Sequence, residues 1–68
     1  MQMTTKEFVE WALKEHKLTQ YRLGKYLKLS PVSIAQYLRG TRMSNRTAAI
    51  VLAKYNVTIT DAFWMYDL

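Results

Sequence analysis

The side chains whose spacing suggests a function in this sequence are amides and cations. They are not nucleophiles or metal ligands. The 68 residues include ten Lys and Arg, five Asp and Glu, one His and no Cys, with a formal net charge of +5. Eight of the ten cations lie between residues 16 and 54, where no acid occurs. A stretch of one sign this long favours a polyanionic partner over the ordinary solvation of a small surface.

Catalysis and metal binding find no support in the residue types. The acids flank the basic zone instead of meeting in pairs, no glycine-rich phosphate loop occurs, and His16 has no second ligand at metal spacing. We therefore expect a protein that is not an enzyme and needs no cofactor, metal or small-molecule ligand. Without cysteine, and with no apolar run longer than residues 48–53, the chain fits a cytoplasmic location and no membrane partner.

Capping signals divide the chain into short helices around one core. Half of the residues are hydrophobic, which suffices for a single domain over residues 1–68. The helix starts are the T-x-x-E capping box at Thr4, then Thr19, Ser30-Pro31 and Ser44. The helix stops are Lys17, Leu27, Gly40 and Asn56. We therefore predict helices over about residues 5–17, 20–27, 31–39 and 45–54.

The end of the chain allows two secondary structures. Thr60 and Asp61 can cap a last short helix through Met65, which would make an all-α, compact bundle of about five short helices. The alternation over residues 57–60 fits a short strand instead. Residues 63–66 are all bulky and cannot all face inward, so we expect Trp64 and Tyr66 to form an exposed patch for dimerisation.

Two of the predicted helices must cross at a steep angle. Only Lys28, Leu29 and Ser30 separate residues 20–27 from residues 31–39, so the two helices cannot lie side by side as a long hairpin. This is helix-turn-helix geometry. At the crossing the backbones approach closely and demand a side chain no larger than alanine, and Gly24 occupies that position.

The helix over residues 31–39 has two different faces. At 100° per residue, its core side carries Ile34, Tyr37 and Leu38. Its opposite side carries only small, polar or basic groups, namely Val32, Gln36 and Arg39, with Ser33 and Ala35 at the edges. Such a face suits a helix that lies in a DNA major groove, where an amide pairs with adenine and an apolar group packs on the thymine methyl.

These residues resemble the helix-turn-helix of the phage repressor and Cro family, also called the XRE type. The resemblance rests on Leu18-Thr19-Gln20, Leu23-Gly24, Leu27, Leu29-Ser30, Ser33-Ile34, Tyr37 and Gly40. It implies a lambda repressor-like DNA-binding domain. The base-contacting residues that it implies are Pro31, Val32, Ser33 and Gln36. The backbone-contacting residues that it implies are Gln20, Arg42, Asn45 and Arg46, with amides at the start of the fourth helix able to bind a phosphate oxygen.

Three positions depart from the family pattern. Lys28 stands where the turn usually has glycine, so a residue with a side chain must adopt positive φ at a cost of about 1 kcal/mol. Pro31 replaces a residue that commonly carries an amide or a charge, so direct readout falls on fewer side chains. Gly24 replaces the usual alanine, which weakens the second helix by up to about 1 kcal/mol.

The sequence thus predicts a small regulator that recognises double-stranded DNA. We expect a homodimeric, nucleoid-associated, Cro-like repressor from a phage or prophage, which binds a palindromic operator. An antitoxin-like or adaptor protein is the alternative, with the helix-turn-helix as scaffold and residues 57–68 bound to a protein partner. Such an adaptor should bind duplex DNA weakly.

Overall fold

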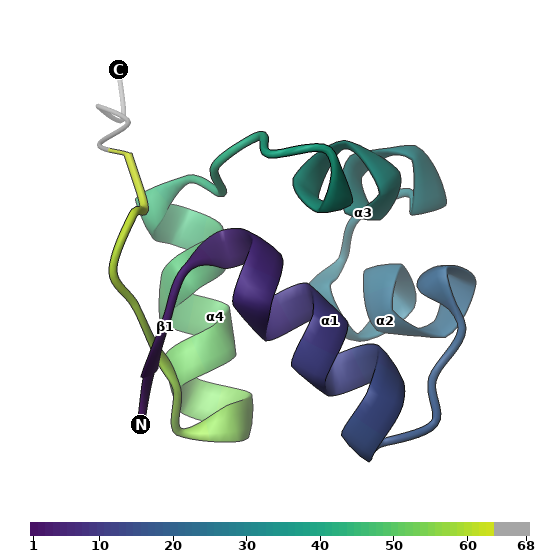
Figure 1. Cartoon of the computed structure of the whole chain (residues 1–68), viewed down its shortest axis with the longest axis horizontal. Helices are drawn as coiled ribbons and strands as arrows, with labels where there is room; N and C mark the ends of the chain where they lie inside the picture. The colour runs from purple at the N-terminus through teal and green to yellow at the C-terminus, as the bar shows by residue number, and fades with distance from the viewer. Residues whose placement is uncertain (64–68) are drawn as a thin grey trace.

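A computed structural model describes residues 1–63, and within them the chain forms four helices and one pair of short strands. In chain order these are β1 (Gln2–Met3), α1 (Thr5–Glu15), α2 (Gln20–Leu27), α3 (Pro31–Leu38), α4 (Asn45–Tyr55) and β2 (Thr58–Ile59). Figure 1 shows α3 lying above α2, with α1 crossing the centre and α4 closing the opposite side. The four predicted helices are confirmed. Each ends within two residues of its predicted last residue.

Each helix begins at the residue that the sequence predicts. The side chains of the four N-caps accept a hydrogen bond from the backbone N–H three residues on, and these caps are Thr4, Thr19, Ser30 and Ser44. The capping box is complete, since Glu7 also accepts from the Thr4 backbone N–H at 2.9 Å. These bonds satisfy donors that a helix start otherwise leaves without partners.

Left-handed residues end two of the helices. Lys28 has φ 60° after α2, and Asn56 has φ 57° after α4. The predicted positive φ at Lys28 is therefore confirmed. Gly40, with φ 110°, follows the C-cap of α3.

The predicted fifth helix is wrong over the residues that the structure describes. Thr60 and Asp61 form a turn, and neither Ala62 nor Phe63 is helical. The alternative, a short strand, is correct, because β2 pairs in parallel with β1 in the register Gln2 with Thr58 and Met3 with Ile59. This segment satisfies its backbone by hydrogen bonds to the N-terminal end of the chain. These bonds outweigh the local capping signal of Thr60 and Asp61.

The core lies between α1 and the other three helices. Its buried members are Phe8, Val9, Ala12, Leu23, Leu27, Ile34, Tyr37, Met43, Val51, Val57 and Ile59. Two rings extend it at one end, where Phe8 packs edge to face on Tyr55 and tilts against Trp11. His16 is the C-cap of α1, exposed to solvent, with its ring 5.1 Å from that of Trp11.

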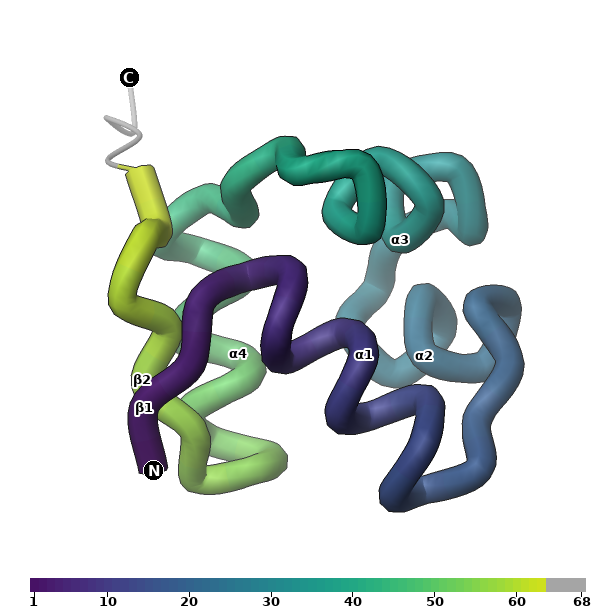
Figure 2. The backbone as a smooth tube through the Cα atoms, viewed as in Figure 1, coloured from purple at the N-terminus to yellow at the C-terminus, as the bar shows by residue number. Residues whose placement is uncertain are grey.

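Residues 57–63, called the C-terminal strap below, run along the outside of the fold. Figure 2 shows this segment passing beside β1 and then rising toward the connection between α3 and α4. Val57 and Ile59 of the C-terminal strap are buried in the core. Its last described residue, Phe63, forms a parallel bridge with Ser44 at the start of α4. In the described part of the chain, every helix is too short or too polar to cross a membrane.

Candidate nucleic-acid interface

The turn between α2 and α3 is held by its own backbone. The N–H of Leu29 donates to the carbonyl of Gly24 at 2.7 Å, and the left-handed Lys28 makes this bond possible by reversing the chain. A Cβ placed on Gly24 would lie 2.7 Å from the carbonyl oxygen of Leu29. The expectation that alanine would fit here is therefore wrong, because this turn approaches α2 more closely than a methyl group allows.

This turn fixes α3 with one face inward and one outward. Ile34 is fully buried and Tyr37 is 7% exposed, whereas Val32 is 64% exposed. Pro31 and Gln36 are also exposed, and Ser33 is half-buried with its hydroxyl 3.4 Å from that of Ser30. The structure thus brings the four predicted base-contacting residues to one helix, three of them fully at its surface.

Tyr37 lies on the inner side of α3 and is 7% exposed. Burial raises the pKa of Tyr37, and the side chain of Thr47, which is itself 6% exposed, partly lowers it. The neutral phenol is therefore favoured.

The predicted backbone-contacting residues lie at two other places. Gln20 is exposed at the first position of α2. Arg42 and Arg46 are exposed on the connection between α3 and α4 and at the start of α4, and Asn45 is half-buried beside them. All of them are near helix starts, where N–H groups and the helix dipole favour anions.

One predicted group is already engaged. The backbone N–H of Asn45 donates to the carbonyl of Phe63 at 2.8 Å, and that of Thr47 donates to Ser44 Oγ at 3.3 Å. These two amides of α4 therefore have partners within the chain. The prediction that amides at this helix start bind a phosphate oxygen does not hold for Asn45 and Thr47.

Comparison with known proteins decides the family. Residues 9–61 match the model of a helix-turn-helix family. The chain belongs to the XRE-type helix-turn-helix family. This is the family of lambda repressor-like and Cro-like proteins, which are DNA-binding regulators of transcription and not enzymes. Searches of the curated proteins and of the solved structures gave no match.

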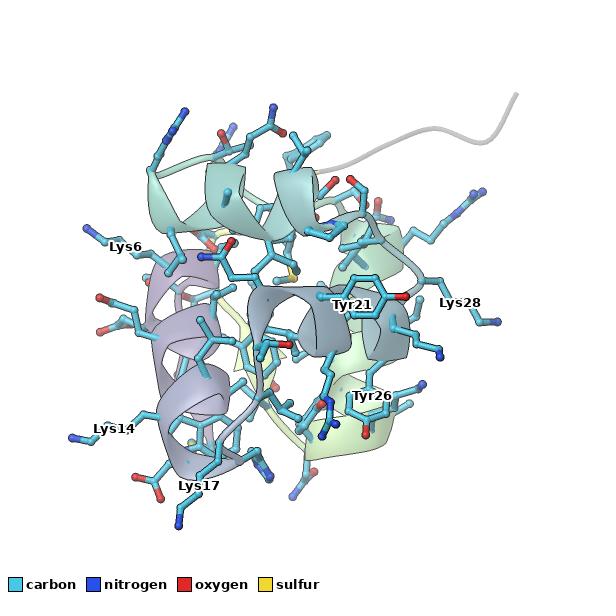
Figure 3. All side chains as sticks on the ribbon, turned by 90° about the vertical axis from the view of Figure 1, so that its right-hand side faces the viewer. Lys6, Lys14, Lys17, Tyr21, Tyr26 and Lys28 are labelled. Carbon is cyan, nitrogen blue, oxygen red and sulfur yellow. The ribbon has the colours of Figure 1, made fainter. Side chains whose placement is uncertain are left out.

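Cations surround the outer side of this XRE-type motif. Those on α2, on its turn and at the end of α3 are all exposed, and they are Arg22, Lys25, Lys28 and Arg39. Figure 3 shows Lys28 on the α2 side of the molecule, far from Lys14 on α1. Lys54 on α4 is also exposed, and its Nζ donates to the carbonyl of Tyr26 at 2.7 Å.

The sequence analysis missed two tyrosines of the XRE-type motif. Tyr21 is 64% exposed and Tyr26 is 47% exposed, and with Arg22 and Lys25 they line a shallow groove on α2. Figure 3 shows both rings on the outer side of this helix. The spacing of Tyr21 with Lys25, and of Arg22 with Tyr26, is the i, i+4 signal that could have found them.

Trp64 and Tyr66, the predicted dimerisation residues, lie outside the described residues. Among residues 1–63, no three His, Asp or Glu side chains come close enough together to hold a metal ion.

Proposed function

We propose that this protein is a sequence-specific, Cro-like repressor that places α3 in the major groove of double-stranded DNA. The observation that carries the proposal is the contrast between the two sides of α3. Val32 is 64% exposed while Ile34, two residues later, is fully buried. A short helix anchored on one side and open on the other can enter a groove without disturbing the core.

Base readout is assigned to the open side of α3. The NH2 group of the Gln36 side chain can donate to N7 of adenine while its carbonyl oxygen accepts from N6. This bidentate pairing is specific for adenine. The Val32 methyl groups can pack on a thymine methyl, and Pro31 adds apolar contact at the helix start. Each good bidentate pair is worth about 1–3 kcal/mol of discrimination, so we expect a preference for A·T steps.

Backbone contacts are assigned to both ends of the motif. Gln20 reaches a phosphate from the start of α2, and Arg42, Asn45 and Arg46 do so from the start of α4. These contacts form with DNA of any sequence, and they set the register in which α3 reads the bases.

A dimer that binds a palindromic operator completes the proposal. Two copies would read half-sites about 34 Å apart, with Trp64 and Tyr66 at their contact. A small phage or prophage repressor of this kind is controlled by its concentration and occludes a promoter. The adaptor alternative gains less support, because Val57 and Ile59 of its proposed docking segment are buried in the core.

Selection of bound duplexes from a random pool, at two salt concentrations, tests the proposal. We expect an enriched palindrome, and Gln36→Ala should lose the preference for adenine at one position of each half-site with modest overall weakening. Arg42→Ala should weaken all sequences alike and reduce the salt slope by about one unit. Lys14→Ala is the matched control, since it removes one charge from α1 on another side of the molecule (Figure 3). A pool without enrichment would refute specific recognition.

A further inference from the structure

One carboxylate of the C-terminal strap, that of Asp61, bonds to the first residue of α1. Asp61 Oδ1 accepts from the backbone N–H of Thr5 at 2.8 Å and from the Thr5 hydroxyl at 2.7 Å. Thr5 is the first residue of α1 and is only 1% exposed. Asp61 thus caps the start of a helix that lies 56 positions earlier in the sequence.

The hydroxyl of Thr5 passes this contact on to the connection between α3 and α4. While it donates to Asp61, it accepts from the backbone N–H of Met43 at 3.0 Å. Met43 is fully buried, so its N–H needs this partner. The residues that follow Arg42 are therefore held from the inside by a hydrogen-bonded chain from Asp61 through Thr5.

The C-terminal strap holds the same connection a second time. The N–H of Phe63 donates to the carbonyl of Met43 at 3.1 Å, and the carbonyl of Phe63 accepts from the N–H of Asn45 at 2.8 Å. Phe63 therefore holds the backbone on both sides of Ser44, and Asp61 acts on Met43 through Thr5. The proposed phosphate contacts, Arg42 and Arg46, flank this segment.

We infer that Asp61 is a positioning residue for DNA-backbone binding, acting through Thr5 on the connection between α3 and α4. This inference rests on the proposed function. It predicts that removal of Asp61 weakens DNA binding. Charge alone predicts the opposite, because removing an acid from a protein that binds a polyanion should by itself strengthen binding. A loss of affinity would therefore report the position of the connection, and not the charge of Asp61.

Two pairs of variants separate the hydrogen bonds from the charge and from folding. Asp61→Ala removes the acceptor, whereas Asp61→Asn keeps an oxygen that can accept both bonds but removes the charge. Thr5→Val removes the hydroxyl at nearly constant shape, and Thr5→Ser keeps it. Each variant is first tested for folding by circular dichroism, and only the folded fraction enters the binding analysis. If Asp61→Ala does not fold, the Thr5 pair decides.

The measurement is titration of the duplex selected by the wild-type protein, at several salt concentrations. We expect Asp61→Ala and Thr5→Val to bind roughly tenfold more weakly, with a salt slope smaller by about one unit and an unchanged preferred sequence. Asp61→Asn and Thr5→Ser should remain within about twofold of wild type. Adding Arg42→Ala to Asp61→Ala should then cost less than it does in the wild-type chain, because the two changes affect one contact.

The outcomes are distinct from those that test the proposed function. If the wild-type protein selects no duplex, both the proposed function and this inference fail. If it selects one, and Asp61→Ala binds as tightly as wild type or more tightly with an unchanged salt slope, the inference alone is overturned. Equal weakening by Asp61→Asn and Asp61→Ala would also overturn it, since Asp61→Asn keeps the accepting oxygen and loss of the two hydrogen bonds would then not explain the weakening.

Discussion

Replacing Gly24 by alanine tests how closely the turn of the motif approaches α2. Helix propensity alone favours alanine at this position by about 1 kcal/mol. Against this, the new Cβ would lie 2.7 Å from the carbonyl oxygen of Leu29 and 3.3 Å from the carbonyl carbon of Ser30. Both neighbours are backbone atoms, so relief requires the whole turn to move, and overpacking of this kind typically costs about 1–3 kcal/mol.

The expected balance is a net loss of stability of up to about 2 kcal/mol, since the gain in propensity offsets only part of the clash. For a domain of this size each kcal/mol lowers the melting temperature by about 4–8 °C. Urea unfolding followed by circular dichroism measures the free energy, and calorimetry measures the melting temperature. Displacement of Leu29 would also lengthen its 2.7 Å hydrogen bond to the carbonyl of residue 24. We therefore expect faster exchange of the Leu29 amide proton.

Gly40→Ala is the matched control for this prediction. A Cβ on Gly40 meets nothing within 4 Å, but its φ of 110° is strained for any residue with a side chain. Its loss of stability is therefore conformational and should leave exchange of the Leu29 amide unchanged. If Gly24→Ala were more stable than wild type, the close approach of the turn would be refuted.

Three further predictions concern stability. Lys28→Gly should raise the free energy of unfolding by about 0.5–1 kcal/mol in urea, because Lys28 has φ 60° and glycine adopts this conformation without strain. Met43→Ala should lower it by about 2–5 kcal/mol, since Met43 is fully buried; a small loss would show that the site collapses around the smaller side chain. Stability should fall as pH rises above 10.0, the ordinary tyrosine value, because burial raises the pKa of Tyr37 in the folded state and the unfolded chain ionises first. Tyr37→Phe should flatten this fall in urea titrations between pH 9 and 11, and an unchanged slope would contradict the role given to burial.

The helices of this fold are predictable because their signals are local. Each N-cap, from Thr4 to Ser44, bonds to an amide three residues away, so a short stretch of sequence contains both partners. The left-handed Lys28 follows instead from the resemblance to the XRE-type motif, whose turn usually has glycine at this position. The two faces of α3 follow from the helical period, which alone separates Ile34 from Val32.

The remaining features depend on partners that are distant in sequence. The signal at Asp61 is that of a helix cap, and Asp61 does cap a helix, but the helix is α1 and not one that follows. Nothing near Asp61 identifies Thr5 as its partner. The strands are equally hard to predict, because each has only two residues and gains its hydrogen bonds from the opposite end of the chain. The engaged amide of Asn45 was missed because its acceptor is Phe63.

The distant capping of α1 also affects how the protein is made. A ribosome releases residues 1–15 long before residue 61, so α1 must wait for almost all of this sequence before its first turn gains the carboxylate. Nascent chains that stop short of the C-terminal strap would lack this acceptor, the pairing of β1 with β2, the bridge to Ser44 and two buried side chains at once. We expect such chains to be recognised by proteases as unfolded, so that shortened copies carrying an intact α2 and α3 do not accumulate and compete for the same DNA sites.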